Sequence, residues 1–207
     1  MFEFFIPVLL IIVSYLIGCF SSARVIARTF RNLRIEKIGS GHPDTTNIYL
    51  NVSKALGLLT GAIDFTMMYL YLFLLQRIFS NTFPLYANQI WLLIFGFMMI
   101  VGHCLPVTNK FRGGRGVITY TGFIAFFAPT AMGFAVLPAL IVVFFFRQTR
   151  FAKFLIVLLL PISCQILSTF FEGQFQNCTP DFVTKLLIGA FLMAILNLIV
   201  AKRLGEI

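Results

Sequence analysis

The sequence predicts an all-α, polytopic membrane protein of about seven transmembrane helices, forming a single domain over residues 1–207. Hydrophobic residues make up 59% of the chain and charged residues only 11%, whereas a soluble domain carries about 25% charged residues. Long apolar runs recur along the chain, and the basic residues between them fall mainly in alternate connections. Such a chain has more apolar surface than a water-soluble core of this length can bury, so we expect lipid to be its solvent.

A helix needs about 20 apolar residues to cross the hydrocarbon core of a bilayer. We expect the first span at residues 4–23, and we expect it to be retained because the N-terminus lacks the basic segment and cleavage site of a secretory signal. The fourth and fifth spans are short and meet at Pro129, so they form either one broken element or a tight helical pair in which Pro129 ends the first helix. The other expected spans are 54–76, 86–105, 116–129, 131–146, 153–171 and 183–201.

The basic residues predict the orientation, because Lys and Arg near span ends stay on the cytoplasmic side. Only Arg77 and Lys185 interrupt the alternation, so we expect the N-terminus outside, the C-terminus in the cytoplasm, and the protein in the inner (cytoplasmic) membrane. Topology is also the simplest explanation for the net charge of +9, which in this context does not indicate nucleic acid. The residues on the expected cytoplasmic side are Arg24, Arg28, Arg31, Arg34, Lys37, Lys54, Lys110, Arg112, Arg115, Arg147, Arg150, Lys153, Lys202 and Arg203. Of these, Arg24, Arg28 and Arg31 share one helical face, which suits anionic headgroups.

The first cytoplasmic connection contains a polar segment, Ile38-Gly-Ser-Gly-His-Pro-Asp-Thr-Thr-Asn47, whose turn formers and polar side chains are untypical of a spanning helix. An imidazole oriented by a carboxylate can take a proton from a hydroxyl group, which makes this segment a candidate catalytic loop. The alternative is that Asp44 caps the following helix and His42 is a solvated turn residue. The candidate catalytic residues are Ser40, His42 and Asp44, and the candidate substrate-binding residues are Thr46 and Asn47.

The third connection contains a basic, glycine-rich segment, Gly102-His-Cys-Leu-Pro-Val-Thr-Asn-Lys-Phe-Arg-Gly-Gly-Arg-Gly-Val117. Adjacent glycines let successive backbone N–H groups converge on an anion, and flanking arginines neutralise its charge. The segment runs directly into the fourth span, which places its amides at a helix N-terminus, where phosphate is favoured. The alternative is an ordinary tight turn between membrane helices. The candidate substrate-binding residues here are His103, Arg112, Gly113, Gly114, Arg115 and Gly116.

Two polar residues near these loops have alternative interpretations. His103 lies at the expected membrane boundary, where it either contacts a substrate or bonds a carbonyl at a helix end. Asp64 lies inside the second span, where a carboxylate is costly, so we expect it to face the bundle interior and to pair, a basic loop residue being one candidate partner.

Together, the two polar segments resemble the motifs of a known family, the acyl-phosphate-dependent glycerol-3-phosphate acyltransferases of bacterial membranes. The run Gly39-Ser-Gly-His-Pro-Asp-Thr-Thr-Asn-Ile48 is similar to the family's first motif, Gly-Ser-Gly-Asn-x-Gly-Ala-Thr-Asn-Val-x-Arg. The runs Gly102-His-Cys-Leu-Pro106 and Phe111-Arg-Gly-Gly-Arg-Gly-Val-Ile-Thr119 resemble the second, Gly-His-x-Phe-Pro followed by Phe-Lys-Gly-Gly-Lys-Gly-Val-Ala-Thr.

The resemblance implies a seven-helix fold whose active site faces the cytoplasm, where glycerol 3-phosphate attacks an acyl phosphate to give lysophosphatidate and inorganic phosphate. The implied partners are acyl phosphate, glycerol 3-phosphate or a similar phosphorylated acceptor, and membrane lipids. No metal, other cofactor or nucleic acid is expected. Because two dianionic substrates must be held together, such a site needs cations and oriented amides more than it needs a protein nucleophile.

Several positions differ from the family pattern. The first-motif arginine falls on Leu50, the second lysine of the glycine segment is Arg115, and the family's C-terminal His and Asn fall on Asn197 and Val200. The serines of a third motif are also absent from 150–156. We therefore expect either a phospholipid-synthesis acyltransferase with a rebuilt site, or a catalytically degenerate paralogue that binds a lipid phosphate or a partner enzyme without turnover. A transporter has little support, because apart from Asp64 the spans have few ionisable residues.

Overall fold

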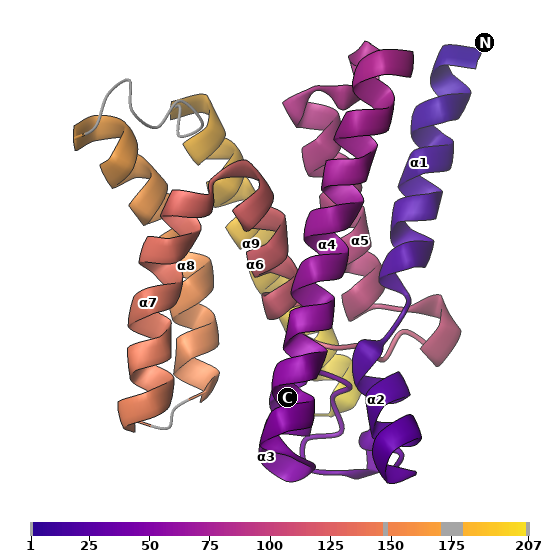
Figure 1. The fold of residues 1–207 in the computed structure, drawn as a ribbon, viewed down its shortest axis with the longest axis vertical. Helices are drawn as coiled ribbons and strands as arrows, with labels where there is room; N and C mark the ends of the chain where they lie inside the picture. Colours follow the sequence, from indigo (N-terminus) through magenta and orange to yellow (C-terminus); the bar gives the residue numbers. More distant parts are fainter. Residues whose placement is uncertain (1, 147–148, 171–179, 206–207) are drawn as a thin grey trace. The chain divides into compact units, whose positions relative to one another are not determined.

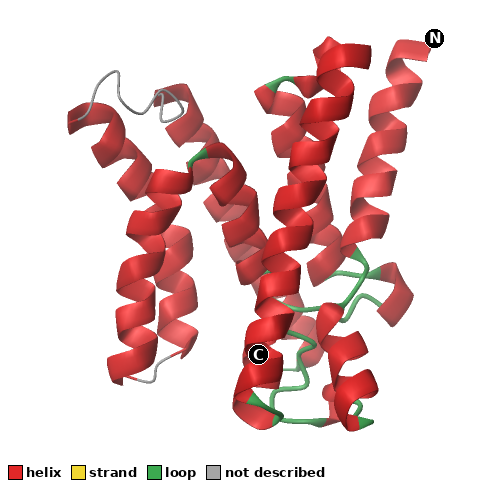
Figure 2. Ribbon diagram, in the orientation of Figure 1, coloured by secondary structure: helices red, strands yellow, loops and turns green. Residues whose placement is uncertain are grey.

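A computed structural model describes residues 2–146, 149–170 and 180–205. Within these residues all regular secondary structure is helical, comprising nine α-helices and three short 3-10 helices (Figures 1 and 2). This confirms the predicted fold class. The helices belong to two compact units. Unit 1 comprises Met1–Phe123 and Leu196–Ile207, and unit 2 comprises Ile124–Ile195. That the whole chain acts as one domain stays a prediction.

Four helical stretches are long and apolar enough to cross a membrane: Phe5–Arg31, Lys54–Thr82, Gln89–Asn109 and Asp181–Arg203. Three shorter apolar stretches also occur: Val117–Phe127, Pro129–Val143 and Leu155–Leu167. These stretches expose many large apolar side chains, including Leu58 and Leu137 at 67% and 60%, as expected for a surface in contact with lipid. The protein is therefore a multi-pass membrane protein, and the count of seven spans stays a prediction.

Unit 1 is built around α1 (Phe2–Gly18), α4 (Lys54–Thr82) and α5 (Gln89–Cys104), with α5 packed against both others (Figure 1). Helices α1 and α5 approach closely at two glycines. A Cβ on Gly18 would lie 2.0 Å from the Met99 carbonyl oxygen, and a Cβ on Gly102 would lie 2.1 Å from the Tyr15 carbonyl oxygen. Small residues at such a contact allow two membrane helices to meet backbone to backbone.

The first span is shorter than predicted, because α1 ends at Gly18 rather than at residue 23. A separate amphipathic helix, α2 (Ser22–Arg31), follows. The Ser21 Oγ accepts a hydrogen bond from the Arg24 backbone N–H at 3.4 Å and so caps α2. Helix α2 buries Ala23 and Ala27 and leaves its arginine face toward solvent, so it does not continue the lipid-facing pattern of α1.

Apart from the connection between α4 and α5, the loops of unit 1 gather at the end away from the N-terminus, beside the start of α4 (Figure 2). Helix α2 and α3 (Thr45–Asn51) pack against α4 there. Helices α6 (Val117–Phe127) and α9 (Pro180–Leu204) each contribute one end to this unit. The short 3-10 helices are η1 (Ile35–Lys37), η2 (Pro84–Ala87) and η3 (Val107–Asn109).

Unit 2 consists mainly of α7 (Pro129–Phe146) and α8 (Thr149–Phe170), which pack against each other. Because α6 ends at Phe127 and α7 begins at Pro129, the interpretation as two helices is confirmed and that of one broken element is not. Pro129 begins the second helix instead of ending the first, a position where its missing N–H is not needed. Arg147, counted above among the basic loop residues, lies outside the described residues.

Candidate functional site

The first loop turns through two glycines before α3 begins. Gly39 and Gly41 have φ angles of +56° and +72°, in the left-handed region that glycine adopts at no steric cost. The Asp44 carboxylate then accepts a hydrogen bond from the Asn47 backbone N–H at 2.8 Å, which makes Asp44 the N-cap of α3. The capping interpretation of Asp44 is therefore confirmed.

The Asn47 side chain holds the first loop in shape. Its amide nitrogen donates to the carbonyl oxygens of Ile38 and His42, both at 2.9 Å, and its oxygen accepts from Asn51 at 2.8 Å. Asn47 is only 2% exposed, so both of its amide hydrogens are used inside the loop. Substrate binding by Asn47 stays a prediction, but the geometry gives the residue a supporting role. Of the other candidates in this loop, Ser40 is exposed and Thr46 is partly buried.

His42 connects the first loop to the second. It is 1% exposed, so its interpretation as a solvated turn residue is wrong. Its Nε2 lies 3.5 Å from an Nη of Arg115. The imidazole of one loop and the guanidinium of the other therefore share one location, although 73 residues separate them in the chain.

The second loop runs from the end of α5 to the start of α6. Lys110, Phe111 and Gly116 have positive φ angles of 54°, 59° and 71°. The backbone N–H of Gly114 donates to the carbonyl oxygen of His103 at 3.2 Å. This amide is satisfied inside the protein, so the expectation that successive glycine amides converge on an anion is wrong for Gly114.

The adjacent glycines of the second loop permit close packing. A Cβ on Gly113 would lie 2.2 Å from the carbonyl oxygen of His103. A Cβ on Gly114 would lie 2.8 Å from His103 Nε2, 3.2 Å from the Pro43 carbonyl oxygen and 3.3 Å from the Asp44 Cβ. Gly114 therefore lies at a contact between the two loops, and their placement at one membrane face stays a prediction.

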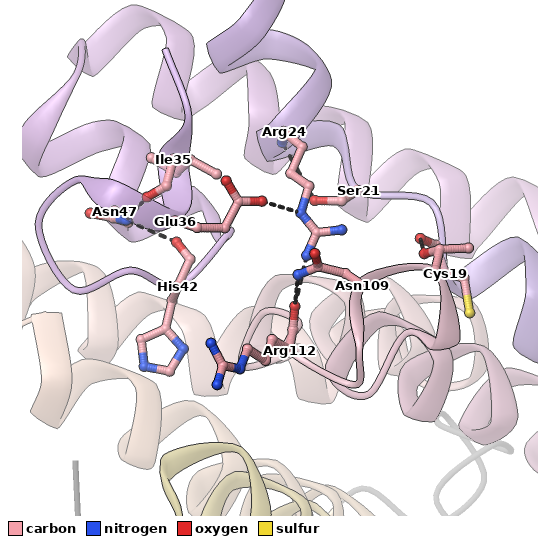
Figure 3. A network of polar contacts seen from close by, with 10 residues as sticks. Cys19, Ser21, Arg24, Ile35, Glu36, His42, Asn47, Asn109 and Arg112 are labelled. Atoms are coloured by element: carbon pink, nitrogen blue, oxygen red, sulfur yellow. Dashed lines mark hydrogen bonds and ion pairs between the residues drawn. The ribbon is translucent and has the colours of Figure 1, made fainter. Parts of the chain in front are cut away.

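A polar network that connects Arg112 to residues outside the predicted site also joins the loops (Figure 3). The Arg24 guanidinium pairs with the Glu36 carboxylate at 2.7 Å and donates to the Arg112 carbonyl oxygen at 2.7 Å. The Asn109 amide donates to the same carbonyl at 2.6 Å. Sequence reasoning missed this network, because Arg24 reads as one of many topology-setting arginines and no local pattern pairs it with Glu36.

Asp64 is buried beneath the first loop. It accepts hydrogen bonds from the hydroxyl groups of Ser22, at 2.5 Å, and Thr45, at 3.5 Å. Its side chain faces inward as expected and is 6% exposed. Among the described residues, its hydrogen-bond donors are these two hydroxyl groups and not a basic loop residue. The carboxylate thus joins α2, α3 and α4.

The C-terminal part of α9 reaches the second loop. The Asn197 amide donates to the Arg115 carbonyl oxygen at 3.4 Å, and the Arg203 guanidinium lies 5.7 Å from the centre of the Phe111 ring. Asn197 thus contacts the candidate site although it was not among the predicted site residues. Of the other altered family positions, Val200 is buried and Leu50 is 59% exposed.

The site that these contacts build is cationic and partly open. Arg112 is exposed and Arg115 partly buried beside His42, so two guanidinium groups and an imidazole lie where the loops meet. One guanidinium group can donate two parallel hydrogen bonds to the oxygens of a phosphate, so this arrangement suits a phosphorylated ligand. Within the described residues no group of three His, Cys, Asp or Glu side chains is placed to hold a metal ion.

Comparisons with known proteins agree with this chemistry. A family model described as glycerol-3-phosphate acyltransferase matches residues 8–204. A glycerol-3-phosphate acyltransferase of Streptococcus mutans is 33% identical over 124 residues, which are 59% of this chain and 54% of the relative. One from Streptococcus pneumoniae is 35% identical over 126 residues, 60% and 55% of the two chains. These matches thus cover little more than half the length of each curated relative.

Two solved structures share the fold. They are crystal structures of PlsY (YgiH), an integral membrane glycerol 3-phosphate acyltransferase, in its glycerol 3-phosphate form and its lysophosphatidic acid form. Their TM-scores are 0.70 and 0.68, at 23% identity and with 95% of this chain and 88% of the other covered.

Proposed function

The chain belongs to the glycerol-3-phosphate acyltransferase family, and from this premise we propose that it transfers an acyl group from acyl phosphate to glycerol 3-phosphate. The products are lysophosphatidate and inorganic phosphate. The observation that carries the proposal is the contact between the two motif loops, with His42 Nε2 3.5 Å from an Nη of Arg115. This contact supports a role for Arg115 as the phosphate-binding cation and a role for His42 as the proton acceptor.

In the proposed reaction, a glycerol 3-phosphate hydroxyl oxygen attacks the carbonyl carbon of the acyl phosphate. The new ester C–O bond forms as the bond between that carbon and the phosphate oxygen breaks. Phosphate leaves with the electron pair, and the hydroxyl proton passes to His42. Arg115 and Arg112 neutralise phosphate charge that would otherwise oppose the approach of two anions.

The remaining candidates have supporting or orienting roles in this proposal. Ser40 and Thr46 carry hydroxyls on the first loop and orient the acceptor. Asp44 fixes the start of α3 through its cap, and Gly113 and Gly114 allow the second loop to close onto the first. Their small size, more than their amides, is what the site uses.

The proposal includes the finer topology of seven spans, with the N-terminus outside and both loops at the cytoplasmic face of the inner membrane. Three features support it. Both loops lie at the same end of unit 1, the basic residues concentrate in connections at that end, and seven apolar helical stretches are present in the described residues. Cysteine labelling at Ser40 and Asn88 in intact cells tests it, with protection expected for Ser40→Cys and labelling for Asn88→Cys.

The test of function is release of phosphate by the purified full-length protein given acyl phosphate and glycerol 3-phosphate. Arg115→Ala should lower the rate by about 100-fold or more, since losing one donor to developing charge costs roughly 10²–10³ in rate. Arg115→Lys keeps the charge and should retain part of the activity. Arg77→Ala, at the far end of α4, is the matched control and should be unchanged. Absence of release by the native protein would overturn the proposal.

Exposure of Leu50 favours one alternative function. The family's first-motif arginine falls on this position, and at 59% exposure the leucine leaves an uncharged patch on α3. Loss of the arginine at this position is expected in a protein that binds a phosphorylated lipid or a partner enzyme without turnover. Thermal stabilisation by glycerol 3-phosphate or lysophosphatidate, abolished by Arg115→Ala and unaccompanied by phosphate release, would establish that alternative.

A further inference from the structure

A second cationic cavity lies beside the candidate active site, between α2 and the segment that contains η1. Its volume is about 550 Å³, and Asn109 of the second loop forms one edge. Arg28 of α2 and Arg34 and Lys37 of the η1 segment line it, with Leu33 at the turn between them. The proposed reaction uses none of these four side chains.

The cavity has an excess of positive charge. Arg24 and Glu36 also line it, but they neutralise each other through their 2.7 Å ion pair. Arg28, Arg34 and Lys37 are exposed, and within the described residues no acidic side chain forms an ion pair with any of them. A hollow lined by charges of one sign concentrates their field and attracts a counter-ion. Topology accounts for the number of basic residues but not for their convergence on one cavity.

The walls of the cavity are fixed by packing and by hydrogen bonds. Ile35 is 1% exposed and packs in a small core with Ala23 and Ala27, which holds the η1 segment against α2. Asn32, at a φ of 51°, ends α2, and its backbone N–H bonds the carbonyl oxygens of Ala27 and Arg28. The cationic side chains therefore project from a shaped backbone and not from a loose tail.

An exposed apolar side chain, Leu33, lines the cationic cavity at 38% exposure. Elsewhere on α2, Phe30 and Val25 are exposed at 59% and 48%. A helix that carries both arginines and exposed apolar residues is typical of one lying in the membrane interface. A ligand placed here would meet cations at one end and apolar surface at the other.

We propose that this cavity binds the phosphate group of an anionic glycerophospholipid, at a place separate from the glycine loop. Arg28, Arg34 and Lys37 contact the phosphate oxygens, and Leu33 contacts the start of an acyl chain. Free inorganic phosphate carries the same chemical group as the lipid headgroup, so the experiment must distinguish these two ligands. The inference does not depend on turnover at the glycine loop.

Native mass spectrometry of the full chain tests the proposal, using dioleoyl phosphatidic acid, dioleoyl phosphatidylcholine and inorganic phosphate as probes. All proteins carry Arg115→Ala, which removes the phosphate-binding arginine of the glycine loop. We expect the protein to retain phosphatidic acid in preference to phosphatidylcholine. Arg34→Gln with Lys37→Gln should weaken its binding about tenfold or more, since each lost charge-assisted hydrogen bond accounts for roughly that factor.

The matched control is Lys54→Gln with Lys202→Gln, which removes the same charge from two exposed lysines outside the cavity. Its binding should stay within about twofold of the parent, because exposed charges contribute little by themselves. Equal weakening by both pairs, or no preference for phosphatidic acid, would overturn the proposal. If the double variant does not fold, judged by its thermal melt, Lys37→Gln alone should still weaken binding measurably.

The inorganic phosphate arm identifies the source of the phosphate group. If phosphatidic acid binds and only millimolar phosphate displaces it, the cavity is a site for a lipid headgroup. If inorganic phosphate binds without phosphatidic acid, and is lost in the Arg34→Gln and Lys37→Gln variant, the lipid assignment is overturned and the cavity is a site for a soluble phosphate. Binding of neither probe above the level of the double variant would refute the site.

Discussion

The two glycine-bearing loops look alike in sequence but use glycine differently. In the first, Gly39 and Gly41 supply left-handed backbone, and the Asn47 side chain holds the turn. In the second, Gly113 and Gly114 leave room for close packing, because a Cβ would lie 2.2 Å from a neighbouring atom on Gly113 and 2.8 Å from one on Gly114. A glycine count therefore does not say whether a loop binds through its amides, turns, or packs closely.

The largest effect should come from filling the packed glycine. Gly113→Ala places a methyl group 2.2 Å from the backbone oxygen of His103, which cannot move without shifting α5. We expect a loss of about 3 kcal/mol or more in unfolding free energy and loss of phosphate release. Gly39→Ala should cost about 1–2 kcal/mol from its left-handed φ alone, and its methyl group would also lie 2.3 Å from the Asn47 Oδ1, so that Asn47 and Asn51 must shift.

Gly133→Ala in α7 is the control for these glycine variants. Nothing lies within 4 Å of a Cβ at this position. Alanine is the better helix former, so the melting temperature should stay the same or rise slightly. Thermal melts of the three variants in one detergent provide the measurement, and equal losses at Gly113 and Gly39 would erase the proposed distinction between the loops.

The next effect isolates the amide that holds the first loop. Asn47→Asp replaces a donor by a carboxylate that faces the carbonyl oxygens of Ile38 and His42. Leaving two buried acceptors without donors should cost about 2–3 kcal/mol. Asn51→Ala, which removes one exposed donor to Asn47, should cost less than about 1 kcal/mol. Chemical unfolding measures both, and a tolerated Asn47→Asp would contradict the assigned role.

A smaller effect separates the two interpretations of Asp44. Asp44→Ala removes the cap of α3 and should cost about 1 kcal/mol. Asp44→Asn keeps an acceptor for the Asn47 backbone N–H, so it should retain most of the stability and most of the phosphate release. A stable Asp44→Asn variant without turnover would instead make the carboxylate charge catalytic.

The smallest effect concerns the connection between the loops. Arg24→Gln breaks the ion pair with Glu36 and the bond to the Arg112 carbonyl oxygen. Both groups are partly exposed, so we expect about 0.5 kcal/mol. A double-mutant cycle with Glu36→Gln measures the coupling, which should be of the same size. A coupling above about 2 kcal/mol would place this pair among the main supports of the site.

The sequence predicted the parts of the fold that depend on local patterns. Apolar runs of sufficient length located the spanning helices to within a few residues, because lipid requires each backbone to satisfy its own hydrogen bonds. The first boundary was wrong because Ser21 caps a new helix near the end of the predicted span, and a length rule ignores such a cap. The contact between the two loops agrees with the predicted alternation of spans, whose number and orientation stay predictions.

The details of the site depend on contacts that no local pattern contains. Asp64 accepts from Ser22 and Thr45, which come from two other helices, so its partner was not predictable from charge alone. The hydrogen bonds from the Asn47 side chain to the carbonyl oxygens of Ile38 and His42 were not predictable in this way, and substrate binding by Asn47 stays a prediction. The alternative of a solvated His42 was wrong because tertiary packing encloses the side chain beside Arg115.

The bond from Asn197 to the Arg115 carbonyl has a consequence for biosynthesis. A ribosome makes Arg115 long before it makes Asn197, which lies 82 residues later. During that interval the glycine loop lacks its contact from α9. The loop therefore acquires this support only after residue 197 has been made.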